Sequence, residues 1–301
     1  MKLFLQRLII FILPFAVVSY TADYIYSKMA IHSNYFPVES WYDLMHGNID
    51  ADIIIMGSSR AWVHIDPIML DSILHISSYN IGMDGSTINR QIHKYNLFRR
   101  FNRKPKVIIQ NIDYSSMGHG TGFKKEQFYP YFWNMEMRKE MLEYEPVTFW
   151  EKYVPFHRYR ETEKNYFTMG PQTLTKGYKG QEKTWDGTNY KAVDSISFTV
   201  NDTTESMFIN YLAKAKSEEI KVIFVYTPIY LGATNKMTNL DAMYAYYRNI
   251  SEKYNIPILD YTYMNICNDT TYFYNALHLN KKGAEIFSDS LAHDLKKVIN
   301  Y

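Results

Sequence analysis

Cysteine is almost absent from this chain of 301 residues, in which Cys267 stands alone. A single cysteine excludes an internal disulfide framework and a zinc site built on cysteine ligands. The chain also has no large excess of either charge, because 33 basic residues nearly balance 31 acidic ones and leave a formal net charge of +2. Nucleic-acid-binding proteins carry a basic patch, so this balance predicts no nucleic-acid partner.

Aromatic residues, in contrast, are abundant, with 28 tyrosines and an aromatic share of 17%. Aromatic rings pack against sugar faces as well as against one another. The tyrosines therefore indicate either a tyrosine-rich core or a glycan-binding surface. The histidines, among them His64, His93 and His119, have no partners at metal-ligand spacing, so we expect no metal and no cofactor.

The first 22 residues have the layout of a secretory signal or a membrane anchor. Lys2 and Arg7 precede a mostly apolar run that ends at Ala22. Tyr20 fits a small-x-small cleavage site poorly, so we expect residues 1–22 to form an uncleaved anchor. A cleaved signal and a buried first helix are the alternatives. The basic start predicts that the rest of the chain faces the periplasm or the exterior of a bacterial cell.

The stretch from Asp52 to Arg60 organises the chain. Residues 53–56 are apolar without alternation, which is typical of a strand buried on both faces. A glycine then ends the strand, so Ser58 and Ser59 should lie at the carboxyl edge of the sheet, where open α/β folds keep their sites. The serines fit either a nucleophile or the N-cap of the next helix. Arg60 either binds an acidic group nearby or is a solvated residue of the helix.

Strands and helices alternate through most of the chain, which predicts a doubly wound parallel sheet. The expected strands are 52–56, 78–81, 106–113, 221–228 and 256–260, and the expected helices are 67–74, 88–99, 204–217, 239–254 and 284–299.

The alternation breaks between residues 116 and 198. We expect this stretch to be an aromatic insertion that forms a lid over the carboxyl edge of the sheet. The domain organisation is then an anchor (1–22), a lead-in (23–51) and one α/β domain (52–301) that carries the insertion.

His278 is the candidate base for a serine nucleophile. It precedes the last helix, and we expect it in a loop directly after the fifth strand, at the same sheet edge as Ser59. Nucleophilic catalysis by serine needs an oriented base within hydrogen-bond reach of the hydroxyl. Ser59 and His278 are far apart in sequence, so only the fold can bring them together.

Three blocks of the sequence, in order, resemble the SGNH or GDSL-like hydrolase superfamily. They are Gly57-Ser-Ser-Arg60, Asn80-Ile-Gly-Met-Asp-Gly-Ser-Thr87 and Asn275-Ala-Leu-His278. The resemblance covers residues 52–115 and 200–300 and implies a three-layer α/β/α sandwich with sheet order 2-1-3-4-5. The Gly-Ser-Ser variant is similar to extracytoplasmic members that take part in polysaccharide O-acetylation and teichoic acid D-alanylation.

The resemblance also implies roles for individual residues. Ser59 takes the nucleophile position and His278 the position of the base, and the backbone N–H groups of Ser59 and Gly85 are the implied oxyanion donors. Asn275 stands where the superfamily has the triad aspartate. Its amide oxygen accepts a hydrogen bond from imidazole but stabilises imidazolium less, and Asp269 or Asp260 could substitute for it.

The asparagine of the superfamily's third block, an oxyanion donor, has no clean counterpart. Asn111 precedes the expected place, and Asp113 lies nearer to it. A carboxylate beside an oxyanion repels its charge unless it is protonated or turned away.

From these residues we expect a serine-dependent acyl-ester hydrolase or O-acyltransferase that acts outside the cytoplasm on a surface glycan. Its partners would be an acylated glycan or an acyl donor, the membrane and a membrane-bound acyltransferase. The alternatives are a catalytically silent binding or scaffold protein of a polysaccharide modification or export complex, and a lipid esterase.

Overall fold

The chain divides into two compact units in the computed structural model. Unit 1 comprises Met1–Tyr42 and Lys124–Thr173, and unit 2 comprises Asp43–Phe123 and Leu174–Tyr301. Each of the two units holds part of the expected insertion 116–198. The residues that the structure describes are 1–118, 125–144, 147–160, 173–188 and 196–299.

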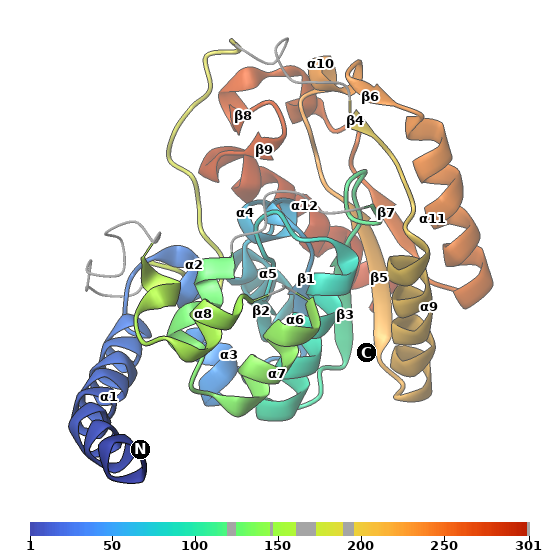
Figure 1. The fold of residues 1–301 in the computed structure, drawn as a ribbon. Helices are drawn as coiled ribbons and strands as arrows, with labels where there is room; N and C mark the ends of the chain where they lie inside the picture. Colours follow the sequence, from blue (N-terminus) through green and yellow to red (C-terminus); the bar gives the residue numbers. More distant parts are fainter. Residues whose placement is uncertain (119–124, 145–146, 161–172, 189–195, 300–301) are drawn as a thin grey trace. The chain divides into compact units, whose positions relative to one another are not determined.

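A five-stranded parallel sheet forms the centre of unit 2 (Figure 1). Its strands are β1 (Ile53–Met56), β2 (Ser78–Asn80), β3 (Val107–Asn111), β5 (Lys221–Tyr226) and β7 (Ile258–Asp260). Their spatial order is β2-β1-β3-β5-β7, while β4 (Ile196–Ser197) and β6 (Met237–Thr238) pair with each other. The strands of the large sheet, counted along the chain, therefore have the order 2-1-3-4-5, and the expected fold class is confirmed.

One face of this sheet is covered by α4 (Ser59–His64), α5 (Pro67–Leu74) and α12 (Lys281–Val298). Alternate residues of β1, Ile53 and Ile55, belong to the hydrophobic cluster on this face together with Phe287 and Leu291 of α12. All four residues of β1 are buried. The uninterrupted apolar run thus reflects a strand that is covered by helices on both sides.

The opposite face packs against α6 (Ile88–Phe101), α9 (Asp202–Ser217) and α11 (Leu240–Tyr254). Phe224 of β5 lies 5.9 Å from the ring of Phe208 and 6.0 Å from the ring of Tyr247, measured between centroids. The hydroxyl of Tyr211 contacts the sulfur of Met56 on β1 at 3.4 Å. Much of the aromatic content therefore lies in the core, in line with the interpretation of the tyrosines as core residues.

Unit 1 begins with a helix that is longer than expected. Its elements are α1 (Lys2–Ala30), α2 (Phe36–Glu39), η1 (Lys125–Tyr131), α7 (Met135–Tyr144), α8 (Phe149–Tyr153) and η2 (His157–Tyr159), and α3 (Tyr42–His46) begins at its boundary. α1 continues for eight residues beyond the expected anchor segment 1–22. α1 continues because Asp23, Ser27 and Ala30 share one face of the helix and are buried.

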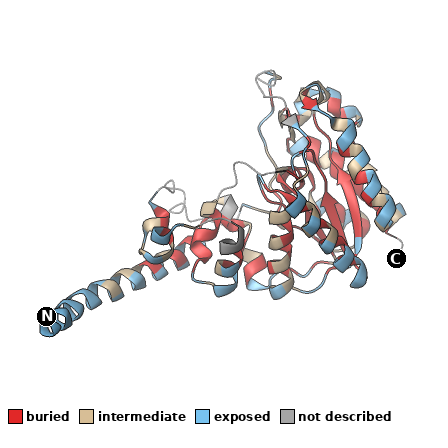
Figure 2. Ribbon diagram, turned by 45° about the vertical axis from the view of Figure 1, so that its right-hand side comes forward, coloured by how far each residue is buried: buried red, intermediate tan, exposed pale blue. Residues whose placement is uncertain are grey.

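The amino-terminal part of α1 is long and apolar enough to cross a membrane. An 18-residue window has a mean hydropathy of 2.0, and none of its residues is buried. Figure 2 shows this part of α1 exposed, with burial only toward its carboxyl end. The alternative of a buried first helix is therefore wrong for this segment.

Aromatic residues of the expected lid pack inside unit 1. Trp41 lies 5.2 Å from Phe128 between ring centroids, and its indole N–H donates to the side chain of Gln127 at 3.0 Å. Residues 119–124, 145–146, 161–172 and 189–195 of the expected insertion lie outside the described residues.

Candidate active site

Gly57 makes the turn that presents the serines at the end of β1. Its φ of +155° lies in a region that L side chains rarely adopt, and an added Cβ would meet the Cβ atoms of Ala61 and Asn111 at 2.6 Å. Glycine thus lets α4 begin immediately after the strand.

The two serines of this turn have different partners. Ser58 is the N-cap of α4: its Oγ accepts from the backbone N–H of Arg60 at 3.4 Å and donates to Asp113 Oδ2 at 2.6 Å. Ser59 Oγ instead lies 2.7 Å from His278 Nε2, within hydrogen-bond distance. The N-cap interpretation therefore applies to Ser58, and the geometry of a nucleophile and its base applies to Ser59.

His278 stands on a short hairpin. The expectation of a loop directly after the fifth strand is wrong, because η5 (Asn265–Asn268) and η6 (Thr270–Tyr272) intervene before β8 (Phe273–Asn275) and β9 (His278–Leu279). The two strands are antiparallel, and Asn275 pairs directly with His278 across a two-residue turn. Directly paired residues hold their side chains side by side. This pairing explains how the Asn275 amide reaches the His278 imidazole although the two residues are three apart in sequence.

Backbone geometry determines which atom of Asn275 faces the imidazole. The N–H of Leu277 donates to Asn275 Oδ1 at 3.0 Å, so this atom must be the oxygen, since a backbone N–H needs an acceptor. The same oxygen lies 2.9 Å from His278 Nδ1. Nδ1 therefore carries the proton, and Nε2 is left as the acceptor that faces Ser59.

The environment keeps the His278 imidazole neutral. Burial of the ring and the nearby guanidinium of Arg60 lower the pKa of His278 to about 3. The ring of Tyr274 stacks on it at 5.3 Å between centroids and 19° between planes. A neutral, firmly held imidazole is ready to accept a proton, but it is a weaker base than an ordinary histidine.

Arg60 is buried, so the expectation of a solvated residue is wrong. Its Nε donates to Thr227 Oγ1 at 3.1 Å, its Nη2 donates to the carbonyl oxygen of Thr227, and its guanidinium lies 4.6 Å from the ring centroid of Tyr226. These contacts connect the first turn of α4 with the end of β5. They also place a positive charge close to His278.

His64 is hydrogen-bonded to the strand that carries His278, a contact that the sequence did not reveal. This fully buried side chain accepts the backbone N–H of Leu279 at its Nε2, at 3.0 Å. Burial, Arg60 and His278 hold the pKa of His64 well below its usual range, in keeping with a neutral acceptor. The only sequence signal was a histidine five residues after Ser59 on the same short helix.

Neither candidate for the third oxyanion donor is free to donate. Asn111 is buried and directs its amide N–H groups at the carbonyl oxygens of Val225 and Ile112, at 3.1 and 3.4 Å. Asp113 accepts from Ser58 through Oδ2 and from the backbone N–H of Ser115 through Oδ1, the latter at 3.0 Å. Its carboxylate is therefore an acceptor in a network of serines.

The loop that carries Gly85 is tied to the nucleophile turn. The N–H of Met83 donates to the carbonyl oxygen of Gly57 at 3.0 Å, and Gly85 itself adopts φ +63°. The amide oxygen of Asn80 accepts the N–H of Gly82 at 2.8 Å, which holds the start of the loop. Gly85 thus lies in a tight turn next to the carboxyl end of β1.

The two aspartates considered as substitutes for the triad acid lie elsewhere. Asp260 accepts from the N–H of Thr262 at 2.9 Å, and Asp269 accepts from the N–H of Thr271 at 2.9 Å. Both are exposed. The Nδ1 position of His278 is occupied by Asn275.

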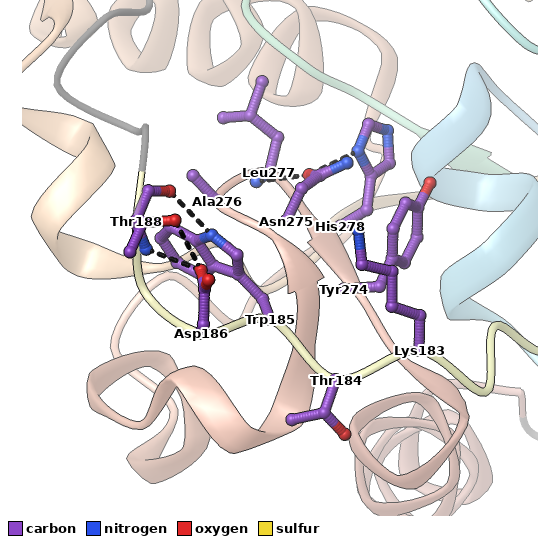
Figure 3. Close-up of a pocket in the computed structure, with 10 residues that line it drawn as sticks. All are labelled: Lys183, Thr184, Trp185, Asp186, Thr188, Tyr274, Asn275, Ala276, Leu277 and His278. Atoms are coloured by element: carbon purple, nitrogen blue, oxygen red, sulfur yellow. Dashed lines mark hydrogen bonds between the residues drawn. The ribbon is translucent and has the colours of Figure 1, made fainter.

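A cavity of about 510 Å³ opens beside the hairpin (Figure 3). One wall is the hairpin itself, with Tyr274, Asn275 and His278, and the opposite wall is part of the segment 174–188, which we call the strap. The strap contributes polar and aromatic groups to this wall: Lys183, Thr184, Trp185, Asp186 and Thr188.

Backbone hydrogen bonds hold the strap at three places within unit 2. Two strap carbonyl oxygens accept backbone N–H groups: that of Lys176 from Asn80 at 2.9 Å and that of Gln181 from Lys281 at 2.8 Å. The strap N–H of Trp185 donates to the carbonyl oxygen of Phe273 at 2.8 Å. Near Lys176, the chain passes so close to Asn80 that an added Cβ at Gly177 would lie 1.9 Å from the Asn80 carbonyl oxygen. The strap is therefore a fixed wall of the cavity.

Within the part of the chain that the structure describes, no group of three or more His, Cys, Asp or Glu side chains is arranged to hold a metal ion. Cys267 is buried. His119 lies outside the described residues.

Comparison with solved structures finds similar proteins at low sequence identity. The chain is similar to a GDSL-like lipase from Bacteroides thetaiotaomicron, with 12% identity, a TM-score of 0.44 and coverage of 88% of this chain and 100% of that one. It is also similar to a member of the lipolytic protein G-D-S-L family from Veillonella parvula, with 11% identity, a TM-score of 0.42 and coverage of 81% and 97%. No family model and no curated protein matches the sequence.

Proposed function

We propose that this protein is a serine-dependent acyl-ester hydrolase or O-acyltransferase that acts outside the cytoplasm on a surface glycan. The observation that carries the proposal is the chain of contacts from Ser59 Oγ to His278 Nε2 at 2.7 Å and from His278 Nδ1 to Asn275 Oδ1 at 2.9 Å. Nucleophile, base and orienting group are in the relation that acyl transfer by serine requires.

In the proposed reaction, Ser59 Oγ attacks the acyl carbonyl carbon while its proton passes to His278 Nε2. The resulting imidazolium keeps its Nδ1–H directed at Asn275 and returns the Nε2 proton to the departing alcohol. An acyl ester on Ser59 remains. Water or a glycan hydroxyl then attacks this ester and gives its proton to Nε2, which passes it to Ser59 Oγ as the bond from Oγ to the acyl carbon breaks. Hydrolysis and transfer therefore differ only in the acceptor.

The oxyanion would be held by backbone groups. The N–H of Ser59 belongs to the first turn of α4, where helix N–H groups have no intrahelical partner. The N–H of Gly85 is the second proposed donor, from the loop tied to Gly57. Asp113 and Asn111 are not needed in this arrangement, because both are engaged elsewhere.

The proposed glycan substrate is supported by the cavity beside His278. Its strap wall carries hydroxyl, ammonium, carboxylate and indole groups, which suit a hydroxyl-rich ligand better than an aliphatic chain. The hairpin adds Ala276 and Leu277 to the lining, so a lipid esterase stays the alternative for a ligand with an aliphatic part. The exposed apolar part of α1 supports a membrane anchor, so that the reaction would take place near the cell surface.

One observation favours the second candidate, a catalytically silent binding or scaffold protein of a polysaccharide modification complex. Asn275 supplies no negative charge, and the pKa of His278 lies at about 3, so the imidazolium of the proposed reaction is costly to form. A membrane-bound acyltransferase partner would then supply the chemistry.

The deciding experiment is phosphonate labelling and p-nitrophenyl acetate hydrolysis by the full chain in detergent micelles. We expect mass spectrometry to find the adduct on Ser59, and Ser59→Ala to lose both labelling and hydrolysis by about a thousandfold or more. Ser58→Ala is the matched control. It should still be labelled, because Ser58 faces Asp113 rather than His278. A folded wild-type chain that is neither labelled nor active would overturn the enzyme and favour the scaffold.

A further inference from the structure

Helix α8 of unit 1 has an inverted distribution of side chains. Phe149, Trp150 and Tyr153 are 64%, 59% and 46% exposed, whereas the one acidic residue of the helix, Glu151, is buried. We call these three aromatic residues the aromatic patch. Large aromatic side chains that are exposed together on one short helix mark an interaction surface.

The orientation of α8 is fixed by the buried Glu151. Its carboxylate accepts from Lys125 at 2.6 Å, from the hydroxyl of Tyr129 at 2.8 Å and from the backbone N–H of Thr148 at 2.8 Å, the last contact completing a capping box. Rotating α8 to bury its aromatic residues would break this network. The aromatic patch therefore faces outward as a consequence of the packing of unit 1.

The segment that includes α8 runs alongside α1, and successive residues of the two are hydrogen-bonded to each other. Tyr20, Asp23 and Ser27 of α1 are hydrogen-bonded, in that order, to Tyr153, the N–H of Phe156 and the hydroxyl of Tyr159. Within unit 1 these contacts place α8 beside α1 at the level of Tyr20. The carboxylate of Asp23 also pairs with the buried guanidinium of Arg158, so this level is firmly set.

Tyr20 lies where the apolar part of α1 ends. From Leu3 to Tyr20, a stretch that is apolar except for Gln6, Arg7 and Ser19, the helix extends about 26 Å at 1.5 Å per residue, close to the thickness of about 30 Å of a bilayer's hydrocarbon core. Trp133 packs edge-on against Tyr20 and Tyr24 at 6.3 and 5.8 Å between centroids. Tyrosine and tryptophan gather at the headgroup level of membrane proteins, where an apolar ring meets a hydrated surface.

We infer that α8 is a second membrane contact, which inserts Phe149, Trp150 and Tyr153 among the phospholipid headgroups beside α1. The ammonium of Lys152 lies 5.1 Å from the ring centroid of Tyr153, so a basic group accompanies the aromatic patch toward the phosphates. This inference rests on the proposed membrane anchor. Two contacts instead of one would prevent unit 1 from rotating about the axis of α1.

Tryptophan quenching in vesicles tests the contact. The full chain is reconstituted in phosphatidylcholine and phosphatidylglycerol vesicles whose acyl chains are brominated near the headgroup. We expect strong quenching of the fluorescence, part of it from Trp133 at the level of Tyr20, and a large decrease of the quenched component in Trp150→Phe, which keeps an aromatic ring but removes the fluorophore. Trp62→Phe is the control: it removes a buried tryptophan of unit 2 and should leave the quenched component in place. Equal quenching in wild type and Trp150→Phe would overturn the inference.

A further variant separates this inference from the anchor on which it rests. Phe11→Trp places a fluorophore in the middle of the apolar part of α1 and is measured in vesicles brominated near the chain ends. If Phe11→Trp gains a quenched component there while Trp150 is not quenched near the headgroup, the anchor stands and the docking of α8 is overturned. The absence of both quenched components would overturn both. The esterase assay reports on the proposed chemistry independently of either result.

Discussion

Asn275 and His278 face each other across the β8–β9 hairpin, with the amide oxygen 2.9 Å from the imidazole Nδ1. The asparagine therefore reproduces the orienting function of a triad acid without its charge. The tautomer is correct for a base, but the imidazolium lacks a counter-ion.

Replacing Asn275 by aspartate should raise the hydrolysis rate. The carboxylate keeps the acceptor for the Leu277 N–H and adds a negative charge next to the ring, so we expect kcat for p-nitrophenyl acetate to rise by about tenfold to a hundredfold. Asn275→Ala is the opposite control, and it should lower kcat because the tautomer is no longer held. An unchanged or lower rate in Asn275→Asp would show that charge at this position does not limit the reaction.

The pH–rate profile should lack the usual acidic limb. The base must be neutral to accept a proton, and with a pKa of about 3 His278 stays neutral through mildly acidic pH. We expect kcat/KM to stay nearly constant from about pH 8 to about pH 5, where a histidine of ordinary pKa would lose about thirtyfold. In Asn275→Asp the limb should move to higher pH. A wild-type limb near pH 6.5 would contradict this account of the His278 environment.

His64, which is buried, and His278, which is half-buried, should make the fold sensitive to acid. Because the pKa values of His64 and His278 are lowered in the native state, the unfolded chain binds protons that the native chain does not once the pH falls below about 6.5. The free energy of unfolding in urea should therefore decrease steadily from about pH 7 to about pH 5. His64→Gln should flatten this decrease, since it removes one of the two groups. A stability that is constant or rises with acid would be incompatible with neutral, buried rings.

His64→Phe should disturb both stability and activity. It leaves the backbone N–H of Leu279 without an acceptor, which costs about 1–3 kcal/mol of the free energy of unfolding, measured by urea denaturation. We also expect kcat to fall with little change in KM. β9 carries His278, the proposed base, whereas the opposite wall of the cavity belongs to the strap and is not held by His64. His64→Gln places an amide oxygen near the former Nε2 and should restore much of kcat. If the two variants behave alike, the hydrogen bond to Leu279 has no positioning role.

Lys183 should influence which ester is preferred. It lies on the strap wall of the cavity, so Lys183→Glu is expected to reduce kcat/KM for an anionic aryl ester by about fivefold to tenfold relative to a neutral one. Lys216→Glu, on the exposed face of α9, carries the same change of charge away from the cavity and serves as the control. Equal ratios for both variants would place substrate outside this cavity.

The sheet was predictable because its signals are local. The apolar run of β1, the glycine after it and the alternation of strands with helices depend on burial and turn geometry that neighbouring residues specify. The pairing of Asn275 with His278 was visible as a spacing. The hairpin that contains both residues was not visible, because the η5 and η6 turns before it have no hydrophobic period.

Other features of the site depend on contacts distant in sequence. His64 finds the N–H of Leu279 only after α4 and β9 have packed together, and a lone histidine carries no sign of such a partner. Trp185 reaches the cavity through a strap without regular structure. Likewise, α1 continues past residue 22, where Asp23 pairs with the buried Arg158. Hydropathy alone shows this position only as the end of an apolar run.

The two hydrogen bonds of the His278 ring close chain loops of very different length. The bond to Asn275 joins residues three apart, whereas the contact with Ser59 joins residues 219 apart. The first needs only a hairpin, and the second exists only when the sheet is assembled from β1 to the last helix. Loop closure over such a distance costs conformational entropy that the completed core must offset. The proposed reactivity of Ser59 would therefore report on complete folding of unit 2, and it should disappear in any partly folded form whose hairpin is still intact.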